Sequence, residues 1–160
     1  MNKEVYHVQN PAIGAAILWR FVYGYKSKNG NPTPFPLLFY VLPIIFREDL
    51  CSIIRSTQKR KGLSKVSEKL FDGKKNDELY TVNNSAIEMR LLTMTAFNIG
   101  TASNLFRMDF NTAMVYVLVD TNKKDVSAPT KHLLDATEKL GEWCAELTLL
   151  EISEWLKVRF

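Results

Sequence analysis

The chain has 160 residues, enough for one domain with a core that needs no disulfide cross-links, because a chain of this length buries about 70% of its unfolded surface. No secretory signal precedes the first predicted helix, and the longest apolar run, 35–46, contains two prolines and is too short to span a bilayer, so we expect a cytoplasmic protein with no membrane partner. The net charge of +4 is unevenly distributed, since residues 55–75 carry +6 and the rest of the chain carries −2.

An almost wholly apolar helix is predicted over residues 11–25. Asn10 can accept hydrogen bonds from first-turn amides, and Pro11 occupies the first helical position, where a missing N–H costs nothing. The apolar stripe is wider than the third of the circumference that is usual for a surface helix, so we expect burial on most sides. Residues 26–34, which contain Asn-Gly and two prolines, are predicted as a loop.

A second apolar helix is predicted over residues 35–46, with Pro36 in its first turn and Pro43 bending it or ending it near Leu42. A short amphipathic helix follows from Glu48 to Arg55, with acidic residues at its positive end. The next helix is predicted over 64–71, with Asp72-Gly73 ending it. Cys51 and Cys144 both fall in predicted amphipathic helices, where a thiol is an ordinary core side chain.

The middle of the chain predicts a helix over 84–98 followed by a β-hairpin. Asn84 or Ser85 would cap this helix, with Glu88 as the capping-box partner and Gly100 ending it. The hairpin is predicted from strands at 104–109 and 113–119. Three helices and a hairpin in this order outline a winged helix-turn-helix, with 84–98 as the recognition helix and 104–119 as the wing. The apolar face of the 84–98 helix is predicted from Ile87, Leu91, Met94 and Phe97.

The C-terminal part predicts a long helix that starts near Ser127 or Thr130, with Pro129 in its first turn, and a last helix after a break near 147–149. The predicted fold class is therefore mainly α (α+β). It consists of a single domain over 1–160, with an N-terminal helical pair (10–46), a winged-helix-like region (48–120) and C-terminal helices (127–157).

No recognisable catalytic machinery is present. His7 and His132 are the only histidines, which argues against a metal site or a nucleophilic triad, and no glycine-rich phosphate loop precedes a Lys-Ser or Lys-Thr pair. The carboxylate pairs Glu48-Asp49 and Glu151/Glu154 have structural explanations at helix ends and on an exposed face. We therefore expect no catalytic residues, no metal and no cofactor.

Several segments together resemble one protein family, the middle component of bacterial three-component ABC-ATPase systems. These segments are Asn10-Pro11-Ala12, Phe21-Val22-Tyr23-Gly24-Tyr25, residues 35–43, residues 138–143 and Val158-Arg159. The resemblance implies a winged-helix-like protein that works beside an SMC-like or RecF-like ABC ATPase and a third, variable effector component. It also implies a role as a connector in defence against phage or plasmid DNA, with DNA contact through the winged region and no catalytic residue to carry over.

The first functional hypothesis is an adaptor that joins the ATPase to the effector through surplus apolar helix surface in 10–46 and in the terminal helices. Aromatic side chains dominate interface hot spots, although each of these residues could instead be a core residue. The candidate anchors are Trp19, Phe35, Phe39, Tyr40, Trp143 and Trp155.

The second hypothesis is a stand-alone module that binds double-stranded DNA, and a third is a regulator such as an antitoxin. Basic residues would neutralise phosphates, with one arginine on the recognition helix and one on the wing, although a lysine-rich loop can equally be a solvated surface. The candidate nucleic-acid-binding residues are Arg55, Lys59, Arg60, Lys61, Lys65, Lys69, Arg90 and Arg107.

Overall fold

The fold was described from a computed structural model, and the structure describes residues 10–71, 76–120 and 128–160. It is mainly helical with one small antiparallel sheet, as the sequence predicts. The helices are α2 (Pro11–Asn29), α3 (Leu38–Ile45), α4 (Glu48–Ser56), α5 (Gly62–Phe71), α6 (Asn76–Glu88), α7 (Arg90–Ala102), α8 (Ala128–Ala145) and α9 (Leu149–Leu156), with short 3-10 turns η1 (Phe35–Leu37) and η2 (Lys59–Lys61). The strands are β1 (Thr33–Pro34), β2 (Phe106–Asp109) and β3 (Met114–Val117).

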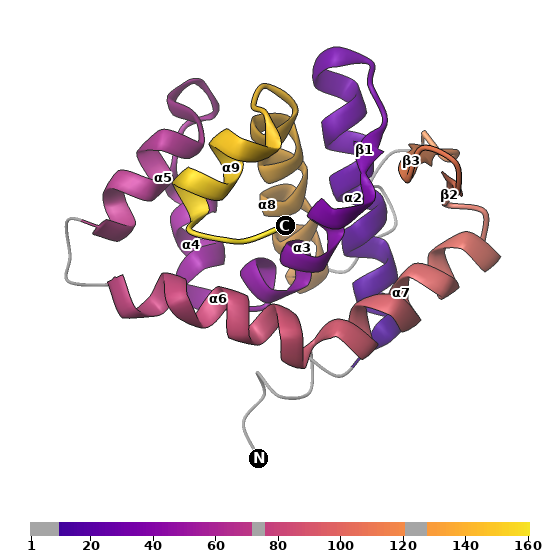
Figure 1. Cartoon of the computed structure of the whole chain (residues 1–160), viewed down its shortest axis with the longest axis horizontal. Helices are drawn as coiled ribbons and strands as arrows, with labels where there is room; N and C mark the ends of the chain where they lie inside the picture. Colours follow the sequence, from indigo (N-terminus) through magenta and orange to yellow (C-terminus); the bar gives the residue numbers. More distant parts are fainter. Residues whose placement is uncertain (1–9, 72–75, 121–127) are drawn as a thin grey trace.

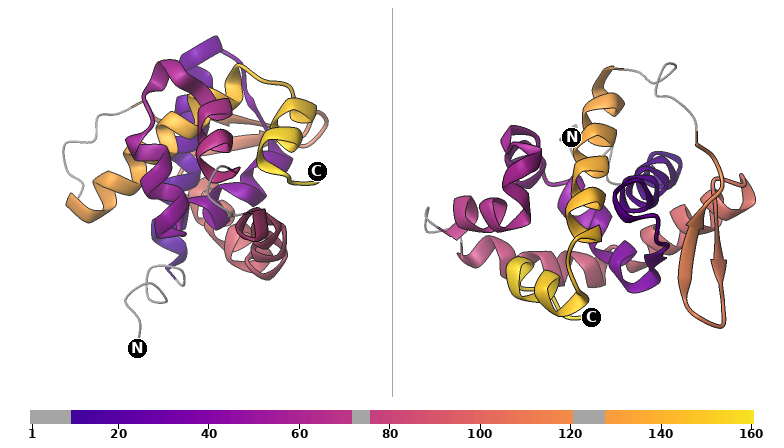
Figure 2. Two further views of the ribbon diagram at one scale, coloured as in Figure 1. Left: turned by 90° about the vertical axis from the view of Figure 1, so that its left-hand side faces the viewer. Right: turned by 90° about the horizontal axis from the view of Figure 1, so that it is seen from above.

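Helices α2 and α8 stand side by side at the centre of the fold (Figure 1). Helices α4 and α5 lie on one flank, the sheet lies on the opposite flank, and α6 and α7 follow one another along the lower edge. The view from above shows the same separation of α4 and α5 from the hairpin (Figure 2). Within the described ranges, none of the helices combines the length and apolar character that crossing a bilayer requires.

Helix α2 begins as predicted but ends later. The Asn10 side chain accepts hydrogen bonds from the backbone N–H groups of Ala12 and Ile13, at 3.0 and 3.4 Å. The predicted loop at 26–34 is wrong for its first four residues, because the helix continues to Asn29. Gly30 ends it in the left-handed conformation, with a φ of 76° and an N–H that donates to the Lys26 carbonyl.

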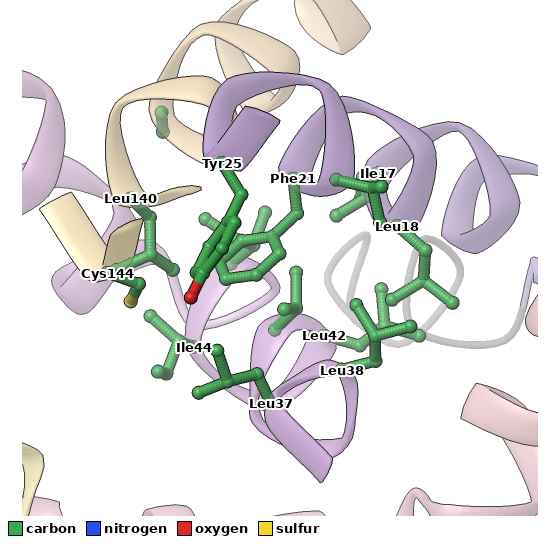
Figure 3. Packing of buried hydrophobic residues seen from close by; sticks show 14 of the residues in the cluster. Ile17, Leu18, Phe21, Tyr25, Leu37, Leu38, Leu42, Ile44, Leu140 and Cys144 are labelled. Atoms are coloured by element: carbon green, nitrogen blue, oxygen red, sulfur yellow. The ribbon is translucent and has the colours of Figure 1, made fainter. Parts of the chain in front are cut away.

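Buried side chains of α2 point onto η1 and α3, and α8 closes the same core from the side (Figure 3). Burial raises the pKa of the Cys144 thiol to about 12, and burial also raises the pKa of Cys51. Both cysteines are therefore core residues, as predicted. The core residues seen together in this region are Ile17, Leu18, Phe21, Tyr25, Leu37, Leu38, Leu42, Ile44, Leu140 and Cys144.

Two glycines let α2 and α8 approach to backbone contact. A Cβ atom at Gly24 would overlap the Glu138 carbonyl oxygen, and one at Gly141 would lie 2.5 Å from the Phe21 carbonyl oxygen. Beside this crossing, the Arg20 guanidinium donates to the Glu138 carboxylate at 2.6 and 3.0 Å, and the Arg20 side chain is only 6% exposed. A buried ion pair of this kind tolerates little change in helix spacing.

The apolar run 35–46 is helical, as predicted, and of the two alternatives for Pro43 the one in which the helix ends near Leu42 is wrong. Pro43 lies inside α3, which continues to Ile45. Since α3 is only 8 residues long and Pro43 lies near its end, the proline removes only the N–H that would pair with the Phe39 carbonyl.

The prediction of a capped helix over 84–98 is wrong. Asn84 and Ser85 lie inside α6, which ends at Glu88, and α7 starts at Arg90 after a single intervening residue, Met89. Gly100 does not end α7. Instead, a Cβ at this position would overlap the ring of Phe106, so the glycine lets β2 pack on the helix. The recognition helix of the winged outline is therefore not one continuous helix.

The other predicted elements of the second half are present. The hairpin pairs β2 with β3 antiparallel, with Phe106 opposite Val117 and Asp109 opposite Met114. A third strand was not predicted: β1 pairs with β3 and ties the end of the α2 loop to the hairpin.

Helices α4 and α5 lie where expected, and the proposed end of α5 at 72–73 lies outside the described residues. The break between α8 and α9 is confirmed.

The substitution Gly24→Ala should destabilise the protein. In an ordinary helix interior the same substitution stabilises the helix by about 0.8–1 kcal/mol. The added methyl would meet the α8 backbone at Glu138, so we expect the free energy of unfolding to fall by about 1–3 kcal/mol. Urea titration followed by circular dichroism measures this change. Lys26→Ala, on the exposed end of the same helix, is the control and should change stability by less than about 0.5 kcal/mol. A Gly24→Ala protein as stable as the wild type would contradict the close crossing.

Candidate partner-binding site

A groove of about 760 Å³ opens between α3, the junction of α6 with α7, and the C-terminal segment, residues 157–160. Phe39 and Tyr40 from α3 form one wall, and Ala86 and Ile87 from α6 form another. The end of the chain lies over α3 (Figure 1), which makes the C-terminal segment the third wall. Three elements that are distant in the sequence therefore build one concave surface.

The C-terminal segment is held in the manner of a bound peptide. Helix α9 ends at Leu156, and the next residue, Lys157, has a left-handed φ of 56° that turns the chain sharply. The side-chain amide of Asn83 then donates to the Lys157 carbonyl at 2.9 Å and accepts from the Arg159 N–H at 3.2 Å. A single amide thus pairs with the backbone of two residues in the segment, as a neighbouring strand would.

Tyr40 fixes the far end of the same segment. Its hydroxyl donates to the Arg159 carbonyl, and its ring meets the Phe160 ring edge to face, with centroids 5.2 Å apart. Burial raises the pKa of the Tyr40 phenol. The neutral phenol is the form that can donate to the Arg159 carbonyl.

Large apolar side chains are uncovered where α6 meets α7. Ile87, which lines the groove in the last turn of α6, is 67% exposed, and Leu91, in the first turn of α7, is 80% exposed. The sequence predicted an apolar helix face that includes these two residues; in the fold both are exposed, whereas Phe97 of the same predicted face is buried. Exposed apolar residues that gather beside a groove are typical of an interaction site.

The predicted aromatic anchors lie in different parts of the fold. Phe39 and Tyr40 line the groove, and the half-buried Phe35 supports it from below, where its ring meets those of Phe39 and Phe97 edge to face. Trp155, on α9, is 39% exposed and is not one of the residues that line the groove.

Trp19 and Trp143 are core residues rather than exposed anchors, which corrects their assignment as interface residues. The indole N–H of Trp19 donates to the Val119 carbonyl at 2.9 Å, and that of Trp143 donates to the Lys59 carbonyl at 2.8 Å. Each tryptophan thus joins two elements inside this chain, because burial of an indole requires an acceptor for its N–H group.

The predicted nucleic-acid-binding residues are not gathered on one surface. Residues 55–69 belong to the flank of α4 and α5, while Arg90 lines the groove and Arg107 stacks on the Tyr116 ring of the hairpin, on the opposite flank (Figure 1). Many of the basic side chains on α4, η2 and α5 already have partners within the chain. Lys59 pairs with Glu142, Lys65 pairs with Glu68, Lys69 donates to Thr57, Arg60 donates to Gln58, and Arg55 contacts His132, while Lys61 is exposed.

No group of three or more His, Cys, Asp or Glu side chains within the described residues is arranged to hold a metal ion. His7 lies outside those residues, and His132 contacts Arg55 rather than a serine or cysteine.

The sequence matches the family described as ABC-three component (ABC-3C) system Middle Component 3 over residues 1–160. The chain belongs to this family. The resemblance to the middle component of three-component ABC systems is thereby confirmed. No curated protein and no solved structure matches the chain.

Residues 138–143 of α8, which form part of the family resemblance, have a structural role in this middle component. Glu138 pairs with Arg20, Gly141 permits the α2 crossing, and the Lys139 ammonium donates to the carbonyls of Ile54, Arg55 and Thr57 at 2.9–3.1 Å. These carbonyls end α4, where the helix dipole favours a cation. Burial, with the nearby Lys59, lowers the pKa of Lys139. The segment therefore joins α8 to α2 and α4.

Sequence reasoning missed Asn83 and the C-terminal segment as parts of a site. Asn83 is one of two adjacent asparagines, and nothing in its local pattern distinguishes it from Asn84. The one available signal was that Val158-Arg159 formed part of the family resemblance. The pairing itself joins residues separated by 76 positions, so it is visible only in the fold.

The substitution Asn83→Ala should release the C-terminal segment without unfolding the protein. It removes two hydrogen bonds, each worth about 0.5–1.5 kcal/mol, so the amide of Arg159 should exchange with deuterium about tenfold faster or more. Hydrogen exchange with mass spectrometry measures this rate. Asn84→Ala is the matched control, since the adjacent Asn84 side chain is exposed on the same helix. Equal exchange rates of the Arg159 amide in the two variants would contradict the role of Asn83 in holding the C-terminal segment.

Proposed function

We propose that this middle component is a non-catalytic connecting subunit that binds another component of its three-component ABC system through the groove. The observation that carries the proposal is the exposed side chain of Ile87, which lines the groove together with Phe39 and Tyr40. Leu91, which follows the groove residue Arg90 in the sequence, is exposed as well and extends the uncovered apolar surface at the start of α7.

The energetics favour burial of this surface by a partner. Covering a leucine or isoleucine side chain is worth about 1.5–3 kcal/mol, and the aromatic rings of Phe39 and Phe160 add flat apolar area next to it. Helix α3 packs on the core through Leu38 and Leu42, so the wall is held before binding and little order has to be created. Such a site suits a permanent or long-lived complex.

A connector needs two contact surfaces, and α9 offers the second. Leu150 and Trp155 are exposed on this helix, which is anchored by a capping box between Thr148 and Glu151. We propose that the groove and these exposed side chains of α9 hold different components, an SMC-like or RecF-like ABC ATPase and a third effector component. In that role the protein would serve a defence system against phage or plasmid DNA.

The substitution Ile87→Asn tests the groove. It replaces an exposed apolar side chain by a polar one without adding charge, so we expect the fold to be retained and the affinity for one purified component of the system to fall at least about tenfold. Isothermal titration calorimetry with the purified ABC ATPase and with the effector measures this affinity.

Leu118→Asn is the matched control, since Leu118 is also exposed but follows β3 on the flank of the hairpin. It should bind like the wild type. Equal affinities for wild-type and Ile87→Asn proteins, or no binding of either component to the wild type, would overturn the proposed function.

DNA contact is a second candidate function, favoured by one observation. The turn η2 presents three consecutive basic residues, Lys59, Arg60 and Lys61, all exposed at the corner between α4 and α5. This candidate covers the alternative of a DNA-binding module or regulator, but it depends on the turn rather than on a recognition helix. Phosphates would be neutralised without base-specific contacts.

If η2 binds DNA, the affinity for a labelled duplex should fall steeply as salt is raised, because each neutralised phosphate releases counterions. Fluorescence anisotropy of the full chain at several salt concentrations measures the slope. The double substitution R60A/K61A should reduce the slope by about 2, while R107A should leave it unchanged. Absence of binding at low salt would exclude this function for the isolated protein.

A further inference from the structure

The charged side chains that line the groove are all basic among the described residues. Arg90 comes from the start of α7, and Lys157 and Arg159 come from the C-terminal segment. The nearest acidic residues along the chain, Glu88 and Glu154, do not line it. The groove therefore combines an apolar surface with a rim of one sign of charge.

Arg90 is exposed at the first position of α7, one residue after the end of α6. The dipole of α6 favours a cation at this point and the dipole of α7 disfavours it, so the helix ends do not decide which charge stands here. Arg90 is therefore an exposed guanidinium on the wall of the groove.

We propose that the groove binds a segment of another component that combines apolar side chains with carboxylates. Apolar side chains would cover Ile87 and Phe39, and carboxylates would pair with Arg90 and Arg159. Arginine suits this role because its planar guanidinium can donate two parallel hydrogen bonds to one carboxylate. The inference rests on the proposed function and adds the chemistry of the partner to it.

Charge complementarity separates this occupant from the others. A second copy of the chain would bring basic rims together, since its own groove carries the same three cations. A nucleic acid would satisfy the cations, but it would leave Ile87 on the groove wall without an apolar partner. A segment with both carboxylates and apolar side chains pairs with the cations of the groove and also covers its apolar wall.

The test is the affinity of the full-length protein for each purified component of its system, measured by calorimetry at low and at physiological salt. Arg90→Glu is the informative variant because it reverses the charge of an exposed side chain on the groove, and it should keep the thermal midpoint of the wild type within a few degrees. We expect it to weaken binding at least about tenfold and to remove most of the salt dependence. Arg60→Glu makes the same charge change on the distant η2 turn and should bind like the wild type.

The outcomes separate this inference from the function on which it rests. If Ile87→Asn weakens binding while Arg90→Glu does not, the groove is the site but its partner is not acidic, and the inference is overturned. Tighter or unchanged binding of the Arg90→Glu protein at low salt overturns it as well. If binding of duplex DNA, rather than of a protein component, is lost in Arg90→Glu, the groove is a nucleic-acid site and the inference is also overturned. If neither groove variant affects any component, the proposed function itself fails.

Discussion

The fold depends on the close crossing of α2 and α8. Gly24 and Gly141 bring the two backbones into contact, and the Arg20 and Glu138 pair fixes the helices beside this point. Because protein interiors are close-packed, the spacing of the central helices sets the position of everything that packs on them. Lys139 on α8 then holds the end of α4 through hydrogen bonds, and Trp143 on α8 holds η2 in the same way.

This crossing explains where the apolar surface of the chain is covered and where it is not. The sequence suggested that residues 10–46 carry more apolar area than the chain can bury. In the fold, α2 and α3 are packed into the core, and α3 exposes only its edge at Phe39 and Tyr40. The uncovered apolar residues lie at the α6 and α7 junction, on α9 and at the hairpin. The groove exists because α6 and the C-terminal segment meet α3 at that edge without filling the space.

Local signals were sufficient for some elements and misleading for others. Asn10 and Pro11 specify the start of α2 within one turn. The pattern Ser85-x-x-Glu88 has the residues of a capping box, yet it lies within α6, where the helix is already hydrogen-bonded and needs no cap. Ile87 and Leu91 have the spacing of a buried face, and only the tertiary structure reveals that nothing covers them. The strand β1 and the hydrogen bonds of Asn83 to the C-terminal segment depend on partners far along the chain, which no local pattern encodes.

The central claim is that the surface formed by α3, the α6 and α7 junction and the C-terminal segment is where this middle component meets another component of its system. Hydrogen exchange of the full chain, alone and in complex with the purified ABC ATPase or effector, measures this surface without any substitution. The account predicts slower exchange on complex formation at residues 36–40, 86–92 and 157–160. Formation of a stable complex with slower exchange only in other parts of the chain would contradict it.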